Sequence, residues 1–354
     1  MFTEEFSVPE ILRQPITDRS AWRGADLRHD NRWYWNLPDA AIRDIDAALA
    51  NPKNTAVPLI QMTRDHLPLP SIERDIAALV QEFEHGRGFV VIRGLPLARY
   101  TDDQIARIFW GIGRHIGNPI SQNAQGDLLG HVKDVGGLTY GATNVRGYQT
   151  TAELSFHNDN CDVVGLLCFR KARAGGVSRL SSATAIYNEV LAKHPEHLDL
   201  LCRGFRYDLR GEERAGIAPI TGYIPVYSYY QGKLSARYVY TSIKQASRKG
   251  NYTLTAEETA ALTFLNQTAA REDIMLEMMQ EPGDMQFCFN HTVFHSRTTF
   301  EDWEKPEDKR HLLRLWLNVP NGRNLAPGVA DRYGTGTGMG VPPPGGEVQA
   351  TMRS

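Results

Sequence analysis

The sequence has few cysteines and no closely spaced cysteine pair. Only 4 of its 354 residues are cysteine, and no CxxC motif occurs. Scattered cysteines exclude a disulfide-stapled secreted scaffold and a zinc ribbon, and three of the four lie in apolar runs, where a thiol packs as a small buried hydrophobe. This cysteine usage favours a reducing, cytoplasmic location. The four positions are Cys161, Cys168, Cys202 and Cys288.

Long apolar runs and an excess of charge of one sign are also lacking. No uninterrupted apolar run could cross a bilayer, and the first six residues do not begin a signal peptide. The formal net charge is −2, so the sequence lacks the positive excess of a nucleic-acid-binding surface. These absences exclude membrane and nucleic acid as the main partners and leave the oligomeric state open.

What is present is typical of a globular protein with a substantial core, at 42% hydrophobic and 23% charged residues. We expect one domain over residues 1–326, with an irregular N-terminal layer over 1–70 that holds a short helix near 40–49. The tail over 327–354 is rich in Gly and Pro, which indicates a flexible end or a flap.

Hydrophobic periodicity predicts both helices and strands. Helical spacing covers 71–85, and Thr101 and Thr255 are N-cap residues for helices to about 116 and over 256–270. A further helix is expected over 185–193. Strands are predicted at 89–92, 163–169, 177–182, 274–279, 285–289 and 312–319, with a Gln231-Gly232 hairpin between 223–230 and 234–240. Strands joined by tight turns, with helices mainly toward the N-terminal side, indicate an α+β protein built on a β-sandwich or barrel.

An imidazole and a carboxylate lie two residues apart in the segment 155–160. If this segment is an extended strand, His157 and Asp159 project from the same face. A third ligand from a distant strand would complete a half-shell around one metal ion. Two histidines and one carboxylate with the opposite face open form the facial triad of non-haem Fe(II) oxygenases. His-x-Asp alone is weak, because a satisfied core pair gives the same pattern.

The second half of the chain supplies the remaining candidates. His295 lies 138 positions after His157 (295 − 157), a separation that suits a strand across a barrel, and His291 is the competing histidine. Arg310 and Arg314 are an even number of residues apart, so both project from one face of a strand. A guanidinium beside a metal is suited to a forked interaction with a carboxylate.

Six segments, in this order, resemble the TauD/TfdA family of Fe(II)/2-oxoglutarate oxygenases, which includes taurine dioxygenase and clavaminate synthase-like enzymes. The resemblance covers most of residues 85–320, and nothing before 70 or after 325 contributes to it. It implies a double-stranded β-helix, or jelly roll, over 71–320 with helical insertions. The segments are Gly88–Gly94, Phe156–Asp159, Ala174–Ser178, Pro282–Asp284, Asn290-x4-His295-x-Arg297 and Arg310–Arg314.

The resemblance also implies roles for single residues. It assigns His157, Asp159 and His295 to Fe(II), and Arg310 to the C5 carboxylate of 2-oxoglutarate. Ser178 stands where relatives have a threonine that hydrogen-bonds the same carboxylate. Arg314 corresponds to a position that helps to bind the cosubstrate or an anionic group of the substrate.

The implied reaction uses Fe(II), 2-oxoglutarate and O2. It couples decarboxylation of 2-oxoglutarate, to succinate and CO2, to hydroxylation of a small molecule that is amino-acid-like or anionic. The carboxylate at position 159 favours hydroxylation over halogenation, because halogenating relatives lack it. A desaturase or oxidative cyclase of the same family stays open, as does a jelly-roll hydrolase or sensor that binds metal without 2-oxoglutarate turnover.

Three further expectations concern the surroundings of the site. The substrate pocket should come from loops within 118–150, 205–240 and after 320. The histidine ligands must be neutral to bind metal, so we expect occupancy to fall as pH drops toward about 6.5. The other histidines expected at the surface or at helix ends are His131, His194, His197 and His311.

Overall fold

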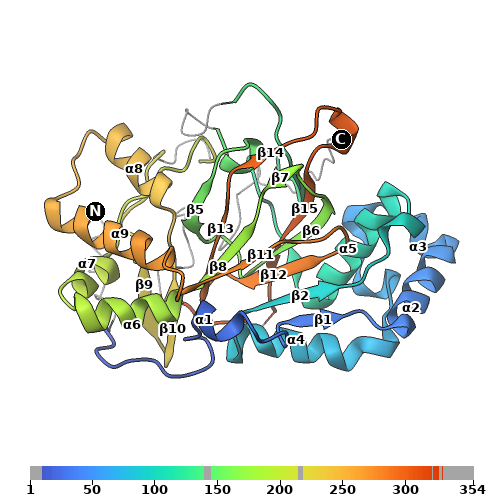
Figure 1. Ribbon diagram of the computed structural model, residues 1–354, viewed down its shortest axis with the longest axis horizontal. Coiled ribbons are helices and arrows are strands. Elements are labelled where there is room, and N and C mark those ends of the chain that lie inside the picture. Colours follow the sequence, from blue (N-terminus) through green and yellow to red (C-terminus); the bar gives the residue numbers. More distant parts are fainter. Residues whose placement is uncertain (1–9, 139–144, 214–217, 321, 327–328, 330–354) are drawn as a thin grey trace.

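Two β-sheets packed face to face form the centre of the protein (Figure 1). The computed structural model describes residues 10–138, 145–213, 218–320, 322–326 and 329. The predicted tail over 327–354 lies outside the described residues, apart from Val329, and the prediction of one domain over 1–326 stays a prediction. The α+β class and the double-stranded β-helix are confirmed by this architecture and by the relatives described below.

The larger sheet has seven strands in the order β1-β2-β12-β6-β15-β3, with β4 also paired to β15. All its pairings are antiparallel except that of β1 with β2. The strands are β1 (Tyr34–Asn36), β2 (Phe89–Arg93), β3 (Asn118–Pro119), β4 (Leu129–Val132), β6 (Val163–Arg170), β12 (Met285–Phe289) and β15 (His311–Asn318).

The smaller sheet has four antiparallel strands in the order β11-β8-β13-β5. Its strands are β11 (Met275–Met278), β8 (Ser178–Ser182), β13 (Val293–Arg297) and β5 (Leu154–His157). Two short ribbons accompany the sheets, one from β9 (Tyr227–Tyr230) and β10 (Lys233–Ala236), the other from β7 (Ala174–Gly175) and β14 (Phe300–Glu301).

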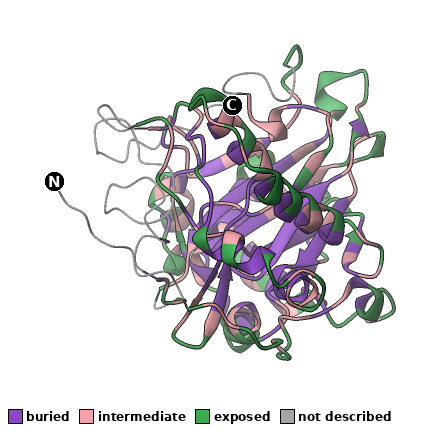
Figure 2. Ribbon diagram, turned by 90° about the vertical axis from the view of Figure 1, so that its left-hand side faces the viewer, coloured by how far each residue is buried: buried purple, intermediate pink, exposed green. Residues whose placement is uncertain are grey.

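Helices cover the outer faces of both sheets, and Figure 2 shows the buried strands enclosed by more exposed helices. The first group, beside the larger sheet, is α2 (Asp39–Ala50), α3 (Pro52–Thr55), α4 (Glu73–His85) and α5 (Asp102–Ile116). The second, beside the smaller sheet, is α6 (Ala183–Lys193), α7 (His197–Arg203), α8 (Tyr240–Lys249) and α9 (Ala256–Ala269). None of the described helices has the length and apolar character needed to cross a membrane.

Strand alternation in the larger sheet separates the core beneath the first group of helices from the core between the two sheets. Along β2, Val90 and Ile92 face the first group of helices, whereas Phe89 and Val91 face the space between the sheets. The same alternation in β15 directs Leu313, Leu315 and Leu317 to the helices and leaves the even-numbered side chains for the interior. This inner space is where the polar candidates of the sequence gather.

Local sequence signals explain several elements. Helices α5 and α9 begin with capping boxes, Thr101 with Gln104 and Thr255 with Glu258, as the predicted N-caps require. The hairpin between β9 and β10 turns at Gln231 and Gly232, whose φ angles are 48° and 79°. Two positive φ values match a two-residue hairpin turn, so this prediction is confirmed.

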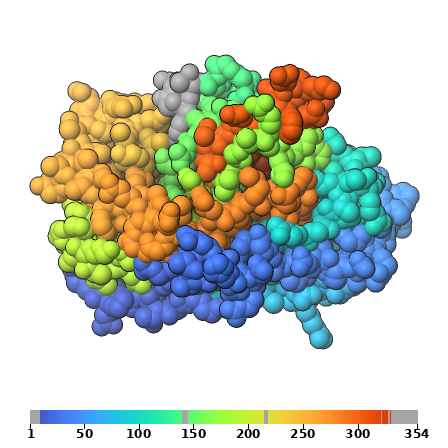
Figure 3. Space-filling model, in the orientation of Figure 1, coloured from blue at the N-terminus to red at the C-terminus, as the bar shows by residue number. Residues whose placement is uncertain are grey.

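The N-terminal layer and one strand differ from the prediction. Residues before 70 include the strand β1 and the short helix α1 (Gly24–Leu27), and Figure 3 shows this blue segment along the lower side of the molecule. The strand predicted over 234–240 ends at Ala236, and helix α8 begins at Tyr240. Ser242, Ile243 and Ala246 are buried along one face of α8, a helical spacing that outweighs the aromatic run before it.

Candidate metal centre

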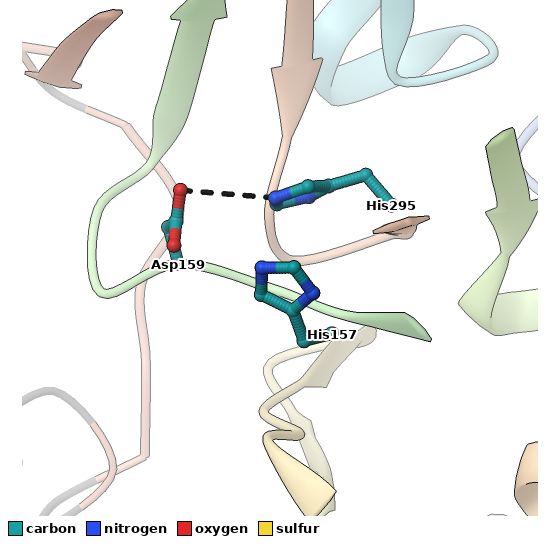
Figure 4. A group of neighbouring side chains, drawn as sticks. All are labelled: His157, Asp159 and His295. Atoms are coloured by element: carbon teal, nitrogen blue, oxygen red, sulfur yellow. Dashed lines mark ion pairs between the residues drawn. The ribbon is translucent and has the colours of Figure 1, made fainter. Parts of the chain in front are cut away.

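Two histidines from distant parts of the chain lie side by side on adjacent strands. His157 ends β5 and His295 lies in the middle of β13, directly opposite each other in the antiparallel register. Their ring centroids are 4.3 Å apart with an interplanar angle of 51° (Figure 4). Strand pairing alone therefore brings together the two imidazoles that the sequence separates by 138 positions.

Asp159 joins this pair from beyond the end of the strand. Its Oδ2 lies 3.8 Å from His295 Nε2, and one ligand atom from each of the three residues lies within 4.8 Å of the others. The expectation that His157 and Asp159 share a face of one extended strand is wrong, because β5 ends at His157. A turn holds Asp159 instead, where its backbone N–H donates to Asn290 Oδ1 at 2.9 Å and its carbonyl accepts from Arg237 at 3.1 Å.

The protonation states suit a metal ion. His157 Nδ1 lies 2.8 Å from the Ser155 carbonyl, so it carries the proton and leaves the Nε2 lone pair free for coordination. Burial lowers the pKa of His157, and lowers that of His295 to about 3. Burial alone would raise the pKa of Asp159, but His295, Arg314, His157 and the Trp316 N–H together lower it to about 2. The site thus presents two neutral imidazoles and one carboxylate.

These pKa values correct one expectation. The sequence predicted that metal occupancy of the site falls as pH drops toward about 6.5, the ordinary pKa of histidine. Because burial lowers the pKa of both histidines, protons compete with a metal ion only at lower pH. In addition, His295 Nδ1 is buried without a hydrogen-bond partner in the described chain. A divalent ion that takes nitrogen and oxygen ligands fits this donor set.

Arg310 lies at the start of β15 as a buried cation with spare donors. Its Nη1 is buried without a hydrogen-bond partner among the described residues, and no described acid lies within ion-pair distance of its guanidinium. Burial lowers the pKa of Arg310 to about 10, because nearby negative charge offsets the loss of hydration only in part. The Phe300 ring centroid lies 5.1 Å from its Cζ. An incoming carboxylate would supply the missing partner.

Ser178 and Arg314 line the same cavity as Arg310. The hydroxyl of Ser178, on β8, donates a hydrogen bond to Gln286 Oε1 at 2.7 Å. The sequence did not indicate this hydrogen bond. Arg314 donates from Nε to Gln122 Oε1 at 2.7 Å, and its Cζ lies 4.6 Å from the Tyr148 ring centroid and 5.1 Å from that of Trp316. The structure therefore gathers all six candidate residues around one cavity.

The cavity holds about 1160 Å³ of space, part of it open to solvent. Its described lining includes five arginines but only one carboxylate, that of Asp159. Four of the arginines already have protein partners: Arg146 pairs with Glu212, Arg210 donates to Thr241, Arg297 donates to the Thr150 carbonyl, and Arg314 donates to Gln122. The arginines are Arg146, Arg210, Arg297, Arg310 and Arg314.

Two of the three segments that the sequence predicted for the substrate pocket line this cavity. Arg146–Tyr148 come from the 118–150 region and Arg210 and Val239 from 205–240, whereas no described residue after 320 lines the cavity. Trp316 was missed, although its even spacing from Arg314 in β15 could have indicated the same face. The sequence indicated these loop segments but not which of their residues line the cavity.

The competing histidines lie elsewhere. His291 is buried and bonds Asp162 Oδ1 through Nε2 at 2.8 Å, away from the triad. His131 Nδ1 lies 2.8 Å from His311 Nε2, so these two form a partly buried pair and the surface expectation for them is wrong. His197 is buried at the start of α7, and His194 is a half-exposed residue at the end of α6.

Comparison with known proteins decides the family. The profile of the taurine catabolism dioxygenase TauD/TfdA family matches residues 53–316. The chain belongs to this family. It is a non-haem dioxygenase that depends on Fe(II), 2-oxoglutarate and O2. The match begins at residue 53, earlier than the motifs in the sequence indicated.

Two curated relatives cover most of this dioxygenase. FR-33289 synthase of Streptomyces rubellomurinus (strain ATCC 31215) is 32% identical over 319 residues, 89% of this chain and 94% of the relative. A taurine hydroxylase-like protein of Stachybotrys chartarum (strain CBS 109288 / IBT 7711) is 27% identical over 317 residues, 86% of this chain and 80% of the relative.

Solved structures share the fold at low identity. Asparagine oxygenase in complex with Fe(II), 3-hydroxyasparagine and succinate has a TM-score of 0.59 and 16% identity, covering 81% of this dioxygenase and 94% of that chain. The non-heme iron oxygenase OrfP in complex with Fe and alpha-ketoglutaric acid has a TM-score of 0.55 and 15% identity, with the same coverage. At this identity the likeness supports the fold.

Proposed function

We propose that this dioxygenase hydroxylates a small anionic molecule. The observation that most supports this proposal is the charge of the cavity. Its described lining has five arginines and a single carboxylate, and that carboxylate belongs to the candidate metal ligand Asp159. Two anions can be accommodated in such a cavity, the cosubstrate and the substrate. A pocket of fixed positive charge favours both by direct pairing and by long-range attraction.

Each candidate residue has one proposed task. His157, Asp159 and His295 hold the iron through two neutral imidazoles and one carboxylate. Arg310 pairs with the C5 carboxylate of 2-oxoglutarate, and Ser178 adds its hydroxyl once it turns from Gln286. Arg314 pairs with the anionic group of the substrate.

When Fe(II), 2-oxoglutarate and O2 are bound, they supply the oxidative chemistry, in which one oxygen atom enters succinate and the other enters a substrate C–H bond. The protein orients the reactants: Arg310, directly before β15, and Arg314, within it, fix the ends of two anions relative to the triad. Val164, Leu166 and Leu312 line the same cavity and limit the access of water.

The rival substrate class is an amino acid. The asparagine oxygenase structure holds hydroxyasparagine, and a structure of OrfP holds hydroxyarginine. An amino acid carries an ammonium group, whose charge is best compensated by a carboxylate, and among the described lining residues Asp159 is the one carboxylate. This charge balance favours an anion without a free ammonium group. Desaturation and ring closure would use the same residues and differ only in how the substrate is placed.

Substrate-stimulated succinate release tests the proposal. The protein is supplied with Fe(II), ascorbate and 2-oxoglutarate and is screened against sulfonates, phosphonates, carboxylates and free amino acids, asparagine and arginine among them. We expect an anion without an ammonium group to stimulate succinate release and to gain one oxygen atom by mass spectrometry. Stimulation by amino acids alone would contradict the substrate class, and stimulated release with loss of two hydrogens would reassign the reaction as desaturation or cyclisation.

A further inference from the structure

Trp316 lies between the candidate metal site and the candidate anion site. It lies on β15, is 4% exposed, and donates its indole N–H to Asp159 Oδ2 at 3.0 Å. We propose that Trp316 is a positioning residue, which sets the orientation of the Asp159 carboxylate and thereby the affinity of the triad for its metal. This inference depends on the proposed metal-binding role of Asp159.

Asp159 needs such a contact because its strand has already ended. The hydrogen bonds to Asn290 and Arg237 fix its backbone, but they leave rotation about the side-chain bonds free. His157 and His295, in contrast, project from paired strands whose ladder fixes both backbones. A carboxylate on a turn can swing between one-oxygen and two-oxygen coordination, and a donor on Oδ2 favours one of these orientations. The buried indole N–H is a donor of this kind.

The same indole also contacts the cation proposed to bind substrate. The Arg314 guanidinium lies over the rings of both Tyr148 and Trp316, with its Cζ 5.1 Å from the Trp316 centroid. The ring face thus supports Arg314 by a cation–π contact, while the ring edge holds Asp159. These two tasks use different parts of one side chain and can be separated by substitution.

Trp316→Phe separates them, because it keeps an aromatic face and removes the N–H. Partners of this kind typically contribute roughly 10- to 100-fold to metal affinity, so we expect Trp316→Phe to bind Co(II) weaker by about that factor. Co(II) affinity is measured by calorimetry on the metal-free full chain, without cosubstrate or turnover. Trp316→Leu, which has no side-chain hydrogen-bond donor, is a second variant in case the first fails to fold.

Trp33→Phe is the matched control. Trp33 is 5% exposed, belongs to the same inter-sheet cluster, and donates its N–H to the Leu27 carbonyl at 3.2 Å. Its Co(II) affinity should equal that of the wild type, even if its thermal stability falls. A purely structural role for Trp316 would lower stability in both variants and leave Co(II) affinity unchanged.

The outcomes distinguish this inference from the proposed function. Wild-type affinity in folded Trp316→Phe or Trp316→Leu would overturn the inference alone. If the wild type binds no Co(II), or if His295→Ala binds it equally well, the proposed metal site fails and the inference fails with it. Weaker binding in both Trp316 variants, with Trp33→Phe unchanged, supports the inference.

Discussion

Arg310 and Arg314 lie four residues apart but have different surroundings. Arg310 is a buried cation with an unsatisfied Nη1, whereas Arg314 is already hydrogen-bonded to Gln122 and makes cation–π contacts with two aromatic rings. An unsatisfied buried cation depends on its ligand for compensation, and a stacked, partly bonded one is held in place before the ligand arrives. We therefore expect the two arginines to serve different ligands.

Arg310→Ala should raise the KM for 2-oxoglutarate far more than that for substrate. Removing the guanidinium leaves the C5 carboxylate buried without its partner, at a cost of about 3–5 kcal/mol, or roughly 10²- to 10⁴-fold in KM. Steady-state kinetics with each substrate varied in turn measures the effect. Equal changes in both constants would refute the assignment of Arg310.

Arg314→Leu should give the reverse pattern. Its loss removes the proposed partner of the substrate anion, so the KM for substrate should rise by about 10²-fold while that for 2-oxoglutarate stays near the wild-type value. The two arginine variants serve as controls for each other. A larger effect of Arg314→Leu on 2-oxoglutarate would reassign this residue to the cosubstrate.

Single residues could be predicted from the sequence where strand alternation or the spacing of a motif constrained their positions. His157, His295 and the two arginines follow from strand alternation and motif order. The surroundings were not predictable in the same way: Asp159 depends on a turn stabilised by Asn290, which lies 131 positions away in the sequence. Partners such as Gln122 and Trp316 become visible only once the strands are paired.

At the scale of elements, the N-terminal segment is not a separate covering layer. Its strand β1 belongs to the larger sheet, and its helix α1 packs against the smaller sheet. Helix α1 lies against β11, with the Gly24 N–H donating to the Ile274 carbonyl at 3.0 Å. A Cβ built on Gly24 would lie 1.8 Å from the Met275 carbonyl oxygen. Because that contact is with backbone, glycine is required for the close approach of α1 to the edge strand of the smaller sheet.

Gly24→Ala should therefore destabilise the fold. A methyl group at this position must displace backbone, so we expect a loss of about 1–3 kcal/mol in the free energy of unfolding, measured by urea denaturation. Gly222→Ala is the control, since a Cβ there meets nothing within 4 Å. Equal stability of both variants would show that α1 does not depend on this contact.

Elements with local signals were predicted well, and elements fixed by distant partners were not. The capped helices α5 and α9 and the turn at Gln231 carry their own signals in the sequence. In contrast, β1 has three residues and exists through its parallel pairing with β2. Short edge strands of this kind have no period long enough to read.

At the scale of the whole molecule, several buried and partly buried histidines link stability to pH. Burial lowers the pKa of His295 and His311 to about 3 and lowers those of His157, His291 and His131. In the unfolded chain these groups titrate near 6.5. As pH falls below 6.5 the unfolded chain takes up protons that the folded chain does not, so stability falls from there toward pH 3.

The metal-free protein should accordingly lose stability between pH 6.5 and 4.5, a window above the ordinary carboxylate range. The buried His295 alone should contribute a slope of about 1.4 kcal/mol per pH unit well below 6.5. Urea denaturation at a series of pH values measures the total slope, and His311→Gln should reduce it. A free energy of unfolding that is constant across this window would contradict the buried, neutral state of these histidines.

The central claim is that His157, Asp159 and His295 hold one Fe(II) ion to which 2-oxoglutarate binds. Anaerobic titration of the metal-free protein with Fe(II) and 2-oxoglutarate, followed by visible absorption, tests it most directly, with His295→Ala and His291→Ala in parallel. We predict a weak visible metal-to-ligand band that saturates at one iron per chain in the wild type and in His291→Ala, and that is absent in His295→Ala. No band in the wild type, or an undiminished band in His295→Ala, would contradict the account.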